Sequence, residues 1–182
     1  MRIIGGRLKG KTIVPPQGYK ARPTTDFAKE GLFNILNNEY EMEGLKVLDL
    51  FGGTGAISYE FASRGASMVY CVEMLPMHAS FIKSQAAAYG MTNLTVVRHN
   101  VFEFLGICRE KFDIIFADPP YALEDLAEIP DKVFACDIMH PGAYFILEHP
   151  DDYDFSGHVF FVKERKYGNV HFSFFEKPYL ED

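Results

Sequence analysis

From Gly44 onward the chain alternates short apolar runs with segments long enough for a helix, and this alternation restricts the fold more than any other feature. The runs are four or five residues long and rich in Val, Ile, Leu and Phe, which predicts buried strands. They cover Lys46–Leu50, Met68–Val72, Leu94–Val97, 112–116 and 143–147. Helices are expected after the first run to about residue 64, from about 76 to 89, and around 126–134. Such β-α-β spacing predicts an α/β fold, a mainly parallel sheet with helices on both faces.

The end of the chain has a different pattern. Residues 159–162 and 170–175 are apolar runs on either side of a probable turn at 167–169, with no room for a crossover helix. Two strands joined so closely predict an antiparallel hairpin that closes the sheet. Together with the five earlier runs, this gives a seven-stranded sheet.

Residues 1–43 are expected to form an N-terminal extension to a main domain at 44–182. Its first 14 residues predict two short strands around a Gly-containing turn, and prolines then mark a loop. Thr24, Thr25 and Asp26 are suitable caps for a following helix. One face of that helix should carry residues at three- and four-residue steps: Phe27, Gly31, Leu32, Ile35 and Leu36.

Several classes of protein are disfavoured by composition. No apolar run approaches the roughly 18 to 20 residues of a membrane span, and the N-terminus lacks the apolar core of a signal peptide, so a cytoplasmic protein is expected. The three cysteines form no C-x-x-C pair and are expected to be reduced. The histidines show no H-E-x-x-H spacing, and no metal site is predicted.

Charge is distributed unevenly along the chain. The net charge is -7, but residues 1–29 hold seven Lys and Arg against one Asp, which leaves 11 bases and 24 acids in the rest. The basic residues are Arg2, Arg7, Lys9, Lys11, Lys20, Arg22 and Lys29. A basic arm on an acidic body favours a polyanionic partner over a merely solvated basic hairpin.

The first chemical motif is the glycine-rich turn after the first strand, which reads Asp49, Leu50, Phe51, Gly52, Gly53, Thr54, Gly55. Glycines allow positive φ and a close approach of a ligand to the backbone, at the edge where open α/β sheets bind ligands. The dinucleotide pattern G-x-G-x-x-G is incomplete, because Ser58 stands where the third glycine would be. An acid ahead of the glycines suits a cationic ligand without a pyrophosphate. Asp49 could contact the ammonium of S-adenosylmethionine, directly or through water; a purely structural turn is the alternative.

Two later positions predict the rest of a nucleoside site. Glu73 ends the second strand, where a carboxylate can accept hydrogen bonds from both ribose hydroxyls of S-adenosylmethionine or of NAD. Asn100 follows the third strand, where a group that reads adenine is expected, although an isolated Asn is as often a helix cap. Met74 and Val101, next to these residues, are also predicted to contact the cofactor.

The most specific motif is Asp118-Pro119-Pro120-Tyr121, after the fourth strand. An exocyclic amine is a poor nucleophile because its lone pair is delocalised into the ring. The Asp118 carboxylate and the Pro119 carbonyl can accept its two N–H bonds, which orients the nitrogen and localises the lone pair. Tyr121 can stack on a base taken out of its native stack. A bland turn is the alternative.

These motifs resemble the cofactor and catalytic motifs of amino-directed class I methyltransferases, whose fold is Rossmann-like. Segments 2–6, 22–26, 30–34 and 165–170 are similar to the bacterial RsmD family, guanine-N2 methyltransferases of small-subunit (16S) ribosomal RNA. The resemblance spans essentially the whole chain. It implies S-adenosylmethionine as cofactor and ribosomal RNA, or a small-subunit assembly intermediate, as partner of a probable monomer.

By position, the resemblance places the glycine-rich turn at the methionine part of the cofactor, Glu73 at the ribose and Asn100 near adenine. Residues 118–121 would hold the target guanine. The predicted RNA-binding residues are Arg7, Lys9, Lys11, Arg22, Thr24 and Thr25. Many members have Asp where Asn100 stands, so this chain departs from the family pattern at the position expected to read adenine. The motif at 118–121 also suits adenine-N6 or a protein glutamine amide, and a non-catalytic RNA-binding factor is a further alternative.

Overall fold

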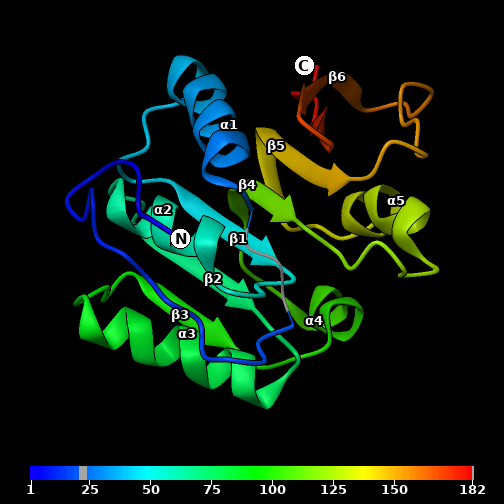
Figure 1. The fold of residues 1–182 in the computed structure, drawn as a ribbon. Helices are drawn as coiled ribbons and strands as arrows, with labels where there is room; N and C mark the ends of the chain where they lie inside the picture. The colour runs from blue at the N-terminus through cyan, green and yellow to red at the C-terminus, as the bar shows by residue number, and fades with distance from the viewer. Residues whose placement is uncertain (21–23, 182) are drawn as a thin grey trace.

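A computed structural model describes residues 1–20 and 24–181 and contains one seven-stranded sheet with the order β3-β2-β1-β4-β5-β7-β6 (Figure 1). The strands are β1 (Lys46–Leu50), β2 (Met68–Val72), β3 (Leu94–Val97), β4 (Phe112–Ala117), β5 (Met139–His149), β6 (Phe161–Tyr167) and β7 (Val170–Glu176). The first five are parallel to one another, and β7 lies antiparallel between β5 and β6. The predicted α/β sheet and its closing hairpin are confirmed.

Helices cover both faces of the sheet. They are α1 (Asp26–Glu39), α2 (Ala56–Ser63), α3 (Pro76–Ala88), α4 (Val101–Ile107), the 3-10 turn η1 (Leu126–Glu128) and α5 (Ile129–Phe134). Buried residues of the first three helices share a core with one face of the sheet, and those of α4 and α5 share a second core with the other face. None of the helices in the described ranges is long and apolar enough to cross a membrane.

The N-terminal segment differs from the two strands that the sequence predicts. Within residues 1–14, all of which the structure describes, one antiparallel bridge joins Arg2 and Thr12, and backbone hydrogen bonds pair residues 1–3 with 10–13. The backbone N–H groups of Ile4 and Gly5 donate to the carboxylate of Glu60 on α2, at 3.1 and 2.8 Å. The segment is therefore a short, irregular hairpin fastened to α2, without two regular strands.

Helix α1 begins where expected, with the Thr25 hydroxyl accepting from the Ala28 N–H at 3.2 Å. The predicted buried face is partly wrong, because Phe27 is 66% exposed. Lys29 is buried instead, at 1% exposure, since its ammonium pairs with Glu60 at 3.3 Å. The core-facing side of α1 therefore carries Lys29, one member of a buried ion pair, whereas Phe27 lies on the exposed side.

Candidate active site

The glycine-rich turn joins β1 to α2 through an unusual backbone. Phe51 has φ of 59°, an uncommon conformation for a residue with a side chain, and Gly53 and Gly55 have φ of 59° and 83°. The Gly52 N–H donates to the Val72 carbonyl of β2 at 2.8 Å, which fixes the turn against the neighbouring strand. The strained turn brings backbone groups to the carboxyl edge of the sheet, as the sequence predicts.

Asp49 ends almost completely buried beneath this turn, at 2% exposure. Its carboxylate accepts a hydrogen bond from the Ser58 hydroxyl at 2.7 Å. Burial raises the pKa of Asp49 to about 8, with smaller contributions from the charges of Asp118 and Glu73. A cationic ligand group nearby would stabilise its ionised form.

Glu73 supports the same turn from β2. One carboxylate oxygen accepts from the Gly53 N–H at 2.7 Å and the other from the Leu75 N–H at 3.0 Å. Each oxygen keeps a lone pair that a ribose hydroxyl could use. Thr54, also predicted to contact the cofactor, is only 3% exposed, so its neighbours' backbone is the accessible part of the turn.

Asn100 is the N-cap of α4, and its Oδ1 accepts from the N–H groups of Phe102 and Glu103 at 2.9 and 3.2 Å. Its Nδ2 lies 3.8 Å from the sulfur of Met74, which is 54% exposed. Val101, the first residue of α4, is 5% exposed and packs in the core beside that helix. Because Oδ1 is used in the helix cap, the Nδ2 amide beside Met74 is the group through which Asn100 could donate to a ligand.

The Asp118–Tyr121 segment continues directly from β4. Asp118 keeps some exposure to solvent, Pro119 is buried, and Pro120 is exposed. Tyr121 is 46% exposed. Burial raises the pKa of Asp118 to about 7. The motif therefore presents one carboxylate and one aromatic ring at the same sheet edge as Asp49 and Glu73.

Glu148 is a site residue that the sequence analysis missed. Ala117 of β4 pairs with Leu147 of β5, so the residues that follow them, Asp118 and Glu148, are neighbours. The two carboxyl groups lie within hydrogen-bonding reach of each other, and the Thr24 hydroxyl donates to Glu148 Oε2 at 3.3 Å. Burial and the charge of Asp118 raise the pKa of Glu148 to about 9. The only sequence signal was a single acid at the end of an apolar strand.

Tyr19 is a second missed residue. Its hydroxyl donates to the Gly53 carbonyl at 2.5 Å, and its ring stacks on His78 with centroids 4.0 Å apart. His78 in turn lies 3.9 Å from the Glu73 carboxylate. The N-terminal segment therefore holds the carbonyl of Gly53 while Glu73 holds its N–H. A lone tyrosine in a loop gave no sequence signal for this contact.

The predicted RNA-binding residues have several different roles. Arg7 donates to the carbonyls of Tyr89 and Gly90 at the end of α3, at 3.4 and 2.9 Å, and so caps that helix. Lys9 and Lys11 are exposed. Thr24 is buried against Glu148, whereas Thr25 is exposed and its hydroxyl caps α1. Arg22 lies outside the described residues.

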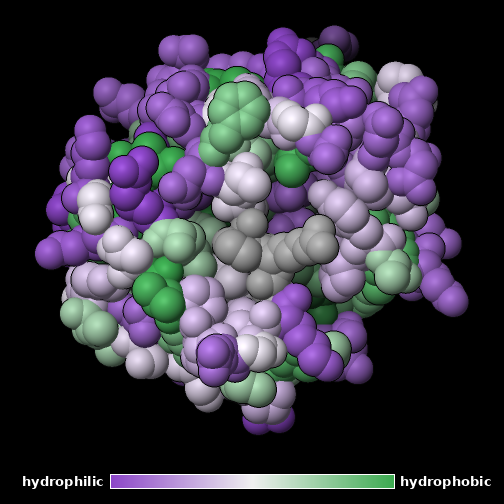
Figure 2. Space-filling model, in the orientation of Figure 1, coloured by the Kyte–Doolittle hydropathy of each residue, from purple (hydrophilic) through white to green (hydrophobic). Residues whose placement is uncertain are grey.

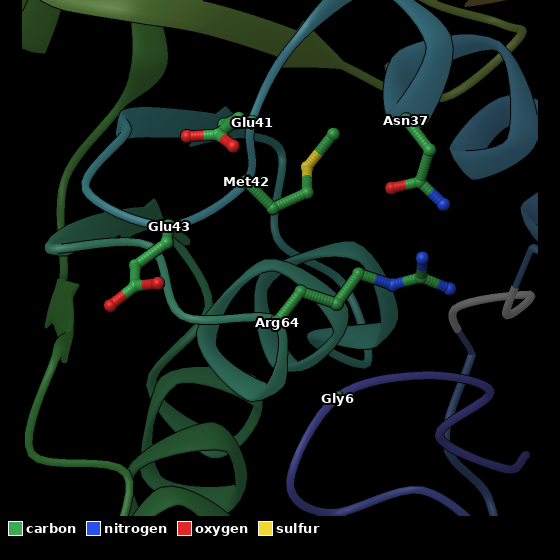
Figure 3. A pocket seen from close by; sticks show the side chains of 6 residues that line it. All are labelled: Gly6, Asn37, Glu41, Met42, Glu43 and Arg64. Atoms are coloured by element: carbon green, nitrogen blue, oxygen red, sulfur yellow. The ribbon is translucent and has the colours of Figure 1, made fainter.

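The surface around this region is mostly polar. Figure 2 shows hydrophilic residues over most of the face seen in Figure 1, with hydrophobic residues in small separated patches. A shallow hollow of about 340 Å³ lies elsewhere, lined by Gly6, Asn37, Glu41, Met42, Glu43 and Arg64 (Figure 3). Because Glu43 precedes β1, this hollow is near the amino end of the strand. It is separate from the carboxyl-edge site.

A family model and several known proteins match this chain. A family model described as "Conserved hypothetical protein 95" matches residues 1–176. The chain belongs to this family. Among proteins similar to it, "Ribosomal RNA small subunit methyltransferase D" of Buchnera aphidicola is 35% identical over 121 residues, which is 66% of this chain and 61% of that protein. "Putative rRNA methyltransferase YlbH" of Bacillus subtilis is 26% identical over 184 residues, which is 97% of this chain and 99% of that protein.

Solved structures agree with the family's fold. "Putative methyltransferase yhhF" from Escherichia coli has a TM-score of 0.84 at 25% identity and covers 98% of both chains. A hypothetical protein of Thermus thermophilus has a TM-score of 0.86 at 30% identity over 97% of this chain and 99% of that one. These matches include the N-terminal segment and the C-terminal hairpin. The class I methyltransferase fold expected from the sequence is therefore confirmed for this family member.

Proposed function

We propose that the chain is an S-adenosylmethionine-dependent methyltransferase that modifies N2 of a guanine in small-subunit (16S) ribosomal RNA. The observation that carries the proposal is the Asp118–Tyr121 motif at the end of β4, on the same sheet edge as the buried acids Asp49 and Glu73. The names of the curated relatives as ribosomal RNA methyltransferases favour this substrate.

The residues at the carboxyl edge fit the proposed cofactor. Asp49, Asp118 and Glu148 have raised pKa values, and no ion pair reaches them from the described residues. Such an acidic site favours a ligand that brings positive charge, as the ammonium and sulfonium groups of S-adenosylmethionine do. Glu73 and the exposed Met74 would hold the ribose and the adenine side of the molecule. When bound, the cofactor supplies an electrophilic methyl group on a sulfur that leaves as a neutral thioether.

The chain's own residues would orient and deprotonate the target. The Asp118 carboxylate and the Pro119 carbonyl accept the two N–H bonds of the exocyclic amine, which aims its lone pair at the methyl group. The Tyr121 ring stacks on the base. After the N–C bond forms, the nitrogen carries a positive charge and gives up one proton to Asp118 or to water. No covalent enzyme intermediate is needed.

The partner would be ribosomal RNA or a small-subunit assembly intermediate in the cytoplasm, bound by a monomer. Lys9 and Lys11 are exposed on the N-terminal segment, whose Tyr19 contacts the glycine-rich turn. Cations there would attract the phosphate backbone and place it beside the site. Arg22 is proposed to join them.

The experiment is transfer of a labelled methyl group to small-subunit RNA and particles isolated from cells that lack this protein, followed by mass spectrometry of the nucleosides. We expect N2-methylguanosine from the wild type and none from Asp118→Ala. Label in N6-methyladenosine would show that the target base is adenine and not guanine. Label in protein glutamine would show that the substrate is a protein and not RNA. Absence of transfer together with absence of cofactor binding by calorimetry would refute the enzyme assignment.

A further inference from the structure

Asp118 and Glu148, at the carboxyl ends of β4 and β5, differ in their exposure to solvent, which suggests separate roles. Glu148 is 4% exposed, whereas Asp118 retains some access to solvent. Phe116 and Ile146, two residues earlier on each strand, belong to the same core, beneath α1. Side chains two positions apart on a strand share a face, so Asp118 and Glu148 lie side by side on the α1 side of the sheet.

Two ionised carboxylates cannot share a hydrogen bond, so the contact between Asp118 and Glu148 requires one proton. Glu148 faces Asp118 from β4, Asp49 from β1 and the Thr24 hydroxyl from the segment before α1. On β7 its cross-strand neighbour is the apolar Phe172. Burial and both neighbouring acids disfavour a charge on Glu148, and together they outweigh the Thr24 hydroxyl, whose hydrogen bond to Oε2 favours the ionised form. The proton therefore belongs mainly to Glu148.

We propose that Glu148 is a positioning residue for methyl transfer: its carboxyl group, anchored by Thr24, donates a hydrogen bond to one oxygen of Asp118 and thereby presents the other oxygen to the target amine. This inference rests on the proposed function. Asp118 stays ionised as the acceptor, and the hydrogen bond from the neighbouring Glu148 carboxyl group restricts the rotation of the Asp118 carboxylate. The proton released by the methylated nitrogen passes to the exposed oxygen of Asp118 and then to solvent, while the proton of Glu148 stays in place.

The pH dependence of a single-turnover methyl transfer tests this role. Wild-type rates should rise with pH as Asp118 ionises, near its pKa of about 7, and fall again as Glu148 loses its proton, near its pKa of about 9. Glu148→Gln keeps an N–H donor that cannot ionise. We expect its rate to stay within about threefold of the wild type at neutral pH and to lack the alkaline fall. Glu148→Ala should lose about tenfold in kcat, the equivalent of one hydrogen bond, with KM and cofactor affinity changed less than about twofold.

Glu110→Gln is the matched control, because Glu110 is exposed and lies before β4, at its amino end. It should keep both limbs of the pH profile. An alkaline fall that persists in Glu148→Gln, or equal losses of rate in the Gln and Ala variants, would overturn the proposal.

Carboxyl ¹³C NMR of the ligand-free protein separates this inference from the proposed function. The wild type should show two coupled titration steps for Asp118 and Glu148, and Glu148→Gln should leave one step for Asp118. An Asp118 titration unchanged by Glu148→Gln would refute the pairing, whatever the substrate is. Failure of the wild type to methylate guanine, with coupled titration intact, would instead refute only the proposed substrate.

Discussion

Removal of the Glu60 carboxylate should destabilise the whole domain, because this group joins three parts of the chain. It accepts hydrogen bonds from the N–H groups of Ile4 and Gly5, at 3.1 and 2.8 Å, and from Arg64 Nε at 3.0 Å. The ammonium of Lys29 lies 3.3 Å away, and the Glu60 and Lys29 side chains are 0% and 1% exposed. In Glu60→Ala the buried ammonium would keep the Arg2 carbonyl, at 2.6 Å, as its one partner within the described part of the chain.

The magnitude follows from the cost of an unpaired buried charge. Breaking a buried ion pair from one side costs about 3–5 kcal/mol in free energy of unfolding. For a domain of this size, about 1 kcal/mol lowers Tm by about 2–4 °C, so Glu60→Ala should lower Tm by about 6–20 °C. The double variant Lys29→Met/Glu60→Leu should be less destabilised than Glu60→Ala, because it removes both charges and refills the space.

Urea and thermal unfolding followed by circular dichroism measure these differences, with the exposed Glu110→Ala as a control expected within about 0.5 kcal/mol of the wild type. Limited trypsin digestion adds a local readout, since Lys9 and Lys11 should be cut faster once the N-terminal segment loses its anchor on α2. A loss below about 1 kcal/mol for Glu60→Ala, or a double variant less stable than Glu60→Ala, would refute the reasoning.

Asp118→Ala should lower turnover by roughly 10²-fold or more with nearly unchanged cofactor affinity; an equal loss of affinity by calorimetry would mean that Asp118 binds the cofactor. Glu73→Ala should show the reverse pattern, with cofactor binding weaker by about 1.5–3 kcal/mol, and unchanged binding would remove Glu73 from the cofactor site. Tyr19→Phe keeps the stack on His78 but loses the bond to Gly53, so cofactor binding should weaken by about 0.5–1.5 kcal/mol; no change would show that the contact is incidental. The pKa of Asp49 is raised to about 8, above its value of about 4 in an unfolded chain, so the folded protein binds the extra proton and ligand-free stability should fall as pH rises from about 4 to 8. Asp49→Asn should flatten the fall in Tm across that range, and a Tm profile like that of the wild type would contradict the assignment.

The first three strands could be predicted from the sequence because each is a short and nearly continuous apolar run. β1, β2 and β3 have the bounds that those runs indicate, although β3 lies at the edge of the sheet and is only partly buried. Helix α4, with seven residues, is too short to show a helical period and was not predicted. The helix expected around 126–134 is a 3-10 turn followed by α5, which begins beside Pro130, a residue suited to a helix start.

The N-terminal segment was harder to predict because its partners are distant in sequence. Strand propensity and turn glycines favoured a hairpin over residues 1–14, but Glu60 and Ser63 of α2 take the N–H groups of Ile4, Gly5 and Leu8. Lys29 is counted in the basic arm for the same reason. Charge patterning favours a polyanionic partner for that arm, whereas the fold uses the charge of Lys29 inside the core.

The candidate site divides in the same way between local and distant determinants. Asp49, Glu73 and Asp118 were predictable because each lies at the carboxyl end of a strand in a recognisable motif, and parallel strands bring their carboxyl ends to one edge. Glu148 also lies near the carboxyl end of its strand, but the role of an acid there becomes clear only when the register places it beside Asp118. Since that register is set by the packing of β4 against β5, any substitution that shifts it by one residue would turn Glu148 to the opposite face and separate the carboxyl pair while leaving every sequence motif intact.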